Sequence, residues 1–95
     1  MTLKNSKAKG SRNERRSRDI FRAAGYYVTR AGASLGEWDL VALGPHGVIL
    51  CQVKTRDWPG ALEMGALRES CPWPYVTRLV HRYRDGVRQP DVREL

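Results

Sequence analysis

An acid and a polar-x-lysine unit are the residues of this sequence whose types and spacing could do chemistry. Asp39 begins the apolar run Asp39-Leu40-Val41-Ala42, and Gln52-Val53-Lys54 ends the next apolar run. Two antiparallel strands joined by a tight turn would bring Asp39 close to Gln52 and Lys54. This layout is typical of a metal-dependent phosphodiesterase site, except that an amide stands where a second carboxylate would be expected.

Hydrolysis of a phosphodiester needs an activated water and compensation of the charge on the phosphorane, and bound Mg²⁺ serves both needs. Asp39 is a natural ligand because Mg²⁺ prefers hard oxygen atoms, and the backbone carbonyl of Val53 would face a metal held there. The amide oxygen of Gln52 can coordinate without adding charge, so we expect reduced metal affinity. Lys54 could orient the attacking water or neutralise the transition-state phosphate. Glu14 would add a second carboxylate if its helix packs beside the hairpin.

Each of these residues also has a purely structural interpretation. Asp39 could be a salt-bridged acid at a strand start, and Gln52 with Lys54 could form the exposed polar face of an edge strand. Glu14 could be only the acceptor half of a capping box with Ser11. The complete set is harder to explain in this way than any single member.

The elements that must position these residues follow from hydrophobic period and turn signals. Gly25 is placed to end the first helix, Gly44-Pro45-His46-Gly47 to form a tight turn, and Asp85-Gly86 to form a hairpin turn. We expect helix, three strands, helix and two strands at about 12–24, 26–30, 38–43, 48–54, 60–70, 75–81 and 87–92. The order α-β-β-β-α-β-β predicts a single α/β domain, a mixed central sheet flanked by helices.

Charge points to a polyanionic partner. The chain has 95 residues, enough for one small domain, and a formal net charge of +7. Residues 1–30 hold nine Lys or Arg against two acids, and such an excess suits phosphate backbones. We interpret residues 1–10 as a flexible basic arm that orders on binding, and residues 11–95 as the folded domain.

Other classes find little support in the sequence. The two cysteines form no metal pattern, and the two histidines are isolated. There is no signal peptide and no apolar run near 18 residues. We therefore expect an intracellular, cytoplasmic protein that works with DNA, with no membrane partner and no small-molecule cofactor.

The ordered series of motifs resembles the archaeal-type Holliday junction resolvases known as Hjc, within the PD-(D/E)xK nuclease superfamily, over residues 9–56. The motifs are Lys9-Gly10-Ser11, Glu14-Arg15, Gly25-Tyr26-Tyr27-Val28-x-Arg30-Ala31-x-Ala33-Ser34, Asp39-Leu40-Val41-Ala42 and Gln52-Val53-Lys54. The resemblance implies a restriction-endonuclease-like fold and a Mg²⁺-dependent enzyme, with Mn²⁺ as a substitute. It also implies a homodimer that resolves four-way DNA junctions by paired nicks.

The resemblance assigns roles residue by residue. It implies that Glu14, Asp39, Gln52 and the Val53 carbonyl hold the metal and that Lys54 is the catalytic lysine. The positions that it matches to DNA contacts are Lys9, Ser11, Arg15, Arg30 and Ser34.

The sequence departs from the family pattern in two places. Gln52 stands where the family has Glu, and Glu37-Trp38 precedes Asp39 where a Pro is common. Related restriction-type nucleases also carry Gln there, so the amide does not imply an inactive site. Two alternatives stay open: a restriction- or repair-type nuclease acting on other DNA structures, and a non-catalytic DNA-binding module in which Gln52 marks lost metal binding.

Overall fold

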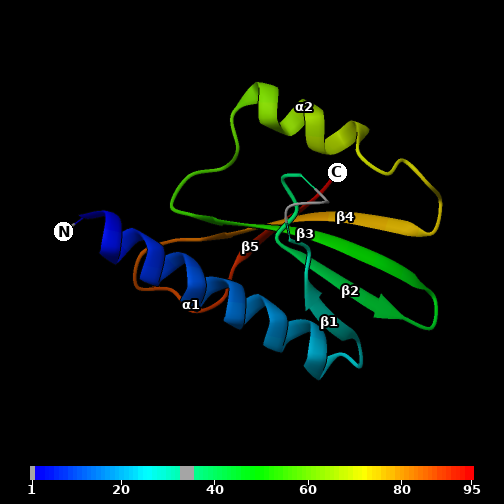
Figure 1. The fold of residues 1–95 in the computed structure, drawn as a ribbon, viewed down its shortest axis with the longest axis horizontal. Helices are drawn as coiled ribbons and strands as arrows, with labels where there is room; N and C mark the ends of the chain where they lie inside the picture. Colours follow the sequence, from blue (N-terminus) through cyan, green and yellow to red (C-terminus); the bar gives the residue numbers. More distant parts are fainter. Residues whose placement is uncertain (1, 33–35) are drawn as a thin grey trace.

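The described residues form a five-stranded mixed sheet with one helix on each face (Figure 1). The computed structural model describes residues 2–32 and 36–95. The elements are α1 (Thr2–Ala23), β1 (Tyr27–Arg30), β2 (Leu40–Gly44), β3 (Gly47–Thr55), α2 (Ala61–Glu69), β4 (Val76–Tyr83) and β5 (Asp91–Glu94). This order confirms the predicted α/β architecture. No helix in the described part of the chain is long and apolar enough to cross a membrane.

The strands lie side by side in sequence order. Every neighbouring pair is antiparallel except β3 and β4, which run parallel. A parallel pair needs a crossover connection, and α2 provides it. Figure 1 shows the result: α1 lies along one face of the sheet, and α2 lies over the other.

Strand alternation divides the core between the two faces. On the α1 face, Phe21 packs with Cys51 and with partly buried Val53. On the α2 face, Leu50 packs with Met64 and Leu67 of the helix. Alternate side chains of β3 therefore point to opposite helices, as its sequence predicted, and Gln52 and Lys54 belong to the α2 face.

Two predicted turns have the expected geometry. Gly25 follows α1 with φ of +95°, and the N–H of Tyr26 donates to the carbonyl of Phe21, which is how a glycine ends a helix. Residues 45 and 46 connect β2 to β3, and Gly44 pairs with Gly47 across the turn. A side chain at Gly47 would clash, since its Cβ would lie 2.5 Å from the carbonyl oxygen of Tyr75.

Three predicted boundaries were wrong. Helix α1 begins at Thr2, about ten residues early, so Ser11 lies inside the helix and is not its N-cap. Residues 2–10 include three Lys, one Ala and one Leu, which favour helix, and the helix continues through Gly10. The division into a basic arm and a nuclease domain stays a prediction, but residues 2–10 are helical.

The other two boundaries shift for local reasons. Strand β2 starts at Leu40 rather than Trp38, since pairing with β1 and β3 begins at Leu40. Trp38 is buried, and its indole N–H donates to the hydroxyl of Ser70. The last strand covers Asp91–Glu94 rather than 87–92. Pro90 has no N–H to offer a sheet, so pairing with β4 begins only after it.

Candidate active site

Asp39 lies directly before β2 and is fixed from both sides. Its N–H donates to the carbonyl of Cys51 at 3.0 Å, and its carbonyl accepts from Ala31 at 2.9 Å. Its carboxylate oxygen Oδ2 accepts the backbone N–H of Val53 at 2.7 Å. The predicted hairpin therefore brings Asp39 against the segment of β3 that carries Gln52 and Lys54.

The environment of Asp39 opposes its ionisation. Burial raises the pKa of the Asp39 carboxyl, and the bond from Val53 only partly offsets this effect. The charge of Glu14 raises the pKa further, whereas Lys54 and Arg30 lower it. A partly desolvated carboxyl that feels one acid and two bases is characteristic of a functional site, because a bound cation would reverse the desolvation penalty.

Glu14 and Arg30 form the wall opposite Asp39. Arg30 donates from Nη2 to Oε1 of Glu14 at 3.1 Å, joining α1 to the end of β1. A hollow of about 340 Å³ lies between them and Asp39. Glu14 thus has a partner across the site and does not cap its helix, so the structural interpretation with Ser11 is wrong.

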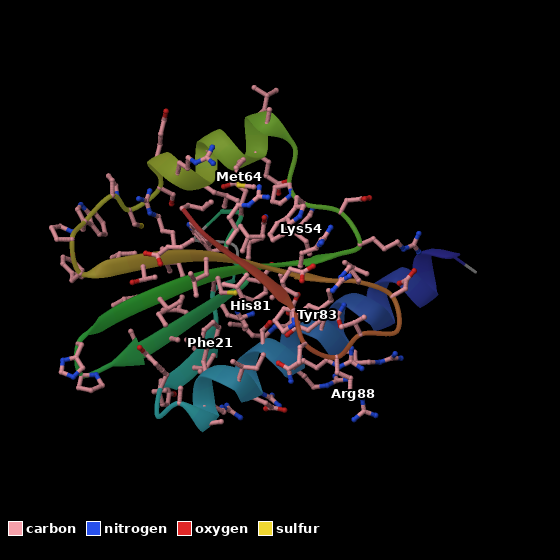
Figure 2. The ribbon with its side chains drawn as sticks, turned by 180° about the vertical axis from the view of Figure 1, so that it is seen from behind. Phe21, Lys54, Met64, His81, Tyr83 and Arg88 are labelled. Atoms are coloured by element: carbon pink, nitrogen blue, oxygen red, sulfur yellow. The ribbon has the colours of Figure 1, made fainter. Side chains whose placement is uncertain are left out.

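Gln52 and Lys54 lie on the α2 face, and both contact an acid of that helix. Nε2 of Gln52 donates to Oε2 of Glu63 at 2.7 Å and to the carbonyl of Glu37 at 3.2 Å. Nζ of Lys54 lies 3.7 Å from Oε1 of Glu63. In Figure 2, Lys54 lies on the same side of the sheet as Met64 of α2, while Phe21 and His81 lie on the other.

Glu63 is the site residue that sequence reasoning missed. Its only local signal was an acid in the first turn of a helix, a position explained equally well by the helix dipole. The crossover rule could have found it. The connection from β3 to the parallel β4 must cover the face that carries Gln52 and Lys54.

One polar atom in this region is left without a partner. Gln52 is buried at 5% exposure, and its Oε1 has no hydrogen-bond partner among the described residues. A buried amide oxygen without a hydrogen-bond partner is available to bind a ligand, and hard cations such as Mg²⁺ prefer oxygen atoms. Within the described residues no three His, Cys, Asp or Glu side chains share a position that could hold an ion. A metal here would therefore depend on the amide and backbone oxygens as well as on acids.

The predicted DNA contacts are only partly described. Ser11, Arg15 and Arg30 gather around a hollow of about 230 Å³ beside Glu14. Lys9 belongs to α1. Ser34 lies outside the described residues.

A second basic hollow, which the sequence did not reveal, lies between α1 and the loop from β4 to β5. It measures about 320 Å³, and four arginines line it: Arg12, Arg16, Arg84 and Arg88. Figure 2 shows Arg88 on this loop beside the helix. Arg84 pairs with Asp91, but no ion pair of Arg12 or Arg88 occurs among the described residues.

The fold, with an acid before one strand and a polar-x-lysine unit on the next, is of the PD-(D/E)xK type. Residues 5–60 match the family model described as the archaeal Holliday junction resolvase, Hjc. The chain belongs to this family, which confirms the resemblance. It is accordingly an endodeoxyribonuclease of the Holliday junction resolvase class, a class that acts on branched DNA and implies a divalent metal.

A solved structure supports the same fold. Hjc of Archaeoglobus fulgidus, a Holliday junction resolvase from an archaeal hyperthermophile, aligns with a TM-score of 0.68 at 21% identity. The alignment covers 92% of this chain and 71% of that one. No curated protein matches the chain.

Proposed function

We propose that this chain is a homodimeric endonuclease that uses Mg²⁺, or Mn²⁺ in its place, to resolve four-way DNA junctions by paired nicks. The observation that carries the proposal is the anchoring of Asp39 on the N–H of Val53. This bond holds a partly desolvated carboxylate against β3 at Val53, the residue next to Gln52, whose buried amide oxygen is without a described partner.

The residues that would hold the metal are Asp39, Gln52 through Oε1, the carbonyl of Val53, and Glu14 across the hollow. A divalent cation supplies an activated water and compensates charge on the phosphorane. The side chains around the cation hold it in place. Asp39 and Glu14 provide the negative charge that attracts the cation, and their partial burial strengthens that attraction.

Lys54 supports the reaction from the α2 face. Its ammonium group acts on Asp39 and is held near Glu63, so it is placed to orient the attacking water and to neutralise the phosphate. Arg30 keeps Glu14 turned toward the site and offers its remaining donors to a backbone phosphate. Lys9, Ser11, Arg15 and Ser34 extend the DNA contact along the same side.

The hollow between α1 and the β4–β5 loop would hold a second stretch of DNA backbone. Four arginines line this hollow against one acid, Asp85, and guanidinium groups bind phosphates in a bidentate manner. Residues 11, 14 and 15 lie around one hollow and residues 12 and 16 around the other. A helix with phosphate contacts on two sides suits a branched substrate whose arms diverge.

Four-way junctions labelled on each strand in turn test the proposal. With Mg²⁺ the wild-type protein should nick two opposing strands at symmetric positions, and Asp39→Ala should bind the junction without cutting it. Mixed dimers of wild-type and Asp39→Ala chains should nick only one strand per junction. Tight junction binding without any nick by the wild-type protein would refute catalysis and favour a DNA-binding module.

A further inference from the structure

The carboxylate of Glu63 contacts two residues of the site at once. One oxygen accepts from Gln52 at 2.7 Å, and the other lies 3.7 Å from the ammonium group of Lys54. We propose that Glu63 supplies the negative charge that the amide at position 52 lacks, and that it positions Gln52 and Lys54 for metal and substrate. This inference rests on the metal-dependent function proposed above.

The position of Glu63 is set by the core and not by chance contact at a surface. Its neighbour Met64 and the nearby Leu67 are buried against the sheet. The side chains of Glu63 and Lys54 are only about one-third exposed, at 33% and 32%. An ion pair of this kind is less screened by solvent than one on an open helix face.

Glu63 also decides which way the Gln52 amide faces. The two neighbours of Nε2, the Glu63 carboxylate and the Glu37 carbonyl, can only accept hydrogen bonds. The NH₂ group must therefore point toward them, which leaves Oε1 as the buried atom without a partner. With a neutral side chain at position 63 this constraint weakens, because the Glu37 carbonyl is then the one remaining neighbour that must accept from Nε2.

The charge of Glu63 acts on a cation through a short path. The amide of Gln52 stands between the Glu63 carboxylate and its own free oxygen, so polarisation by the acid makes that oxygen a better ligand. Partners of metal ligands contribute substantially to metal binding, and their loss lowers affinity about 10- to 100-fold. Glu63 is therefore a positioning residue, separated from the metal by one side chain.

A charge-exchange experiment tests the inference. Mn²⁺ binding is measured by calorimetry for the wild-type protein, Glu63→Gln, Gln52→Glu and the double variant. Glu63→Gln should bind Mn²⁺ about 10- to 100-fold more weakly. The double variant returns one carboxylate to the pair and should recover to within about threefold of wild type. Glu69→Gln, an exposed acid of the same helix, should change nothing.

Unfolding without metal gives a second readout. Gln52→Glu sets two carboxylates against each other in a desolvated place, so it should lower Tm when Glu63 is present and much less in the Glu63→Gln background. Additive effects on Tm, or undiminished Mn²⁺ binding by Glu63→Gln, would overturn the role of Glu63 and leave the nuclease function intact. A wild-type protein without Mn²⁺ affinity would instead overturn the metal-dependent function itself.

Discussion

Two polar clusters lie on opposite faces of the sheet, one fully buried and one partly exposed, and they differ in whether the hydrogen bonds of their buried atoms are complete. On the α1 face, the Ser17 hydroxyl bonds to Nδ1 of His81 and to the hydroxyl of Tyr83, both at 2.8 Å. On the α2 face, Gln52 keeps an oxygen without a described partner. We call the group of Ser17, His81 and Tyr83 the complete cluster, and the group of Gln52, Asp39, Lys54 and Glu63 the open cluster.

The complete cluster holds the fold together. Ser17, His81 and Tyr83 are all at most 2% exposed, and Phe21 stacks on the His81 ring at a centroid distance of 5.1 Å. Every one of these groups links α1 to β4. Satisfied polar groups of this kind fix one packing arrangement, whereas the open cluster keeps its oxygen and its desolvated acid for a ligand.

The largest effect should follow from Asp39→Asn in the open cluster. Junction cutting should fall about a thousandfold, since the change removes charge that acts in the transition state. The free energy of unfolding should not fall, because burial already disfavours the charged form of Asp39 and an amide oxygen can still accept the N–H of Val53. Single-turnover cutting and chemical denaturation measure the two quantities. If Asp39→Asn lowered the free energy of unfolding as well as the cutting rate, the open cluster would be needed for stability too, and it would not differ from the complete cluster in role.

Ser17→Ala, in the complete cluster, should lower the stability of the protein and leave its junction cutting unchanged. It leaves the Tyr83 hydroxyl and the His81 ring without the partner they share, at a cost of about 3 kcal/mol in the free energy of unfolding. Cutting per folded molecule should stay near wild type. Tyr83→Phe should lower the free energy of unfolding by less, since it removes the hydrogen bond between Ser17 and Tyr83 together with the tyrosine hydroxyl itself. A Ser17→Ala protein of unchanged stability would show that the cluster does not hold α1.

The contributions of the two clusters to the stability of the protein should also change with pH in opposite directions. Burial lowers the pKa of His81 from 6.5 to about 4. Between pH 6.5 and pH 4 the histidine is therefore protonated in the unfolded chain but not in the folded protein. The free energy of unfolding falls as the pH falls through this range. The loss should reach about 2 kcal/mol by pH 5. Asp39 has a raised pKa, so the folded protein gains its proton first and stability rises as pH falls toward 3.8.

Denaturation from pH 7.5 to pH 4.5 separates the two contributions. His81→Gln should remove most of the acid-side loss. Asp39→Asn should make that loss steeper, because the opposing contribution of the carboxyl disappears. Equal pH profiles for wild type and His81→Gln would contradict the role given to the histidine.

The features that the sequence predicted correctly are those that depend on neighbouring residues along the chain. Strand alternation placed Gln52 and Lys54 on one face, and the turn at Gly44–Gly47 brought Asp39 to them. These follow from period and turn chemistry alone. Glu63 could not be found in this way, because its contact with β3 arises from how α2 crosses the sheet. The early start of α1 was missed because Ser11 and Glu14 match a capping box within the helix and because the polar segment before them, which includes Gly10, gives no strong helix signal.

The smallest effect should come from the arginine hollow behind α1, and it tests whether junction contacts extend beyond the open cluster. Arg88→Ala should weaken junction binding about threefold at moderate salt and lower the slope of log K against log salt by about 0.9, as expected when one phosphate contact is lost. Arg68→Ala, on the exposed side of α2, removes the same charge and should change neither quantity. The nick position should stay the same in both variants, because neither residue contacts Asp39 or Gln52. An Arg88→Ala protein that matches Arg68→Ala in salt slope would confine DNA binding to the side of α1 that carries Glu14.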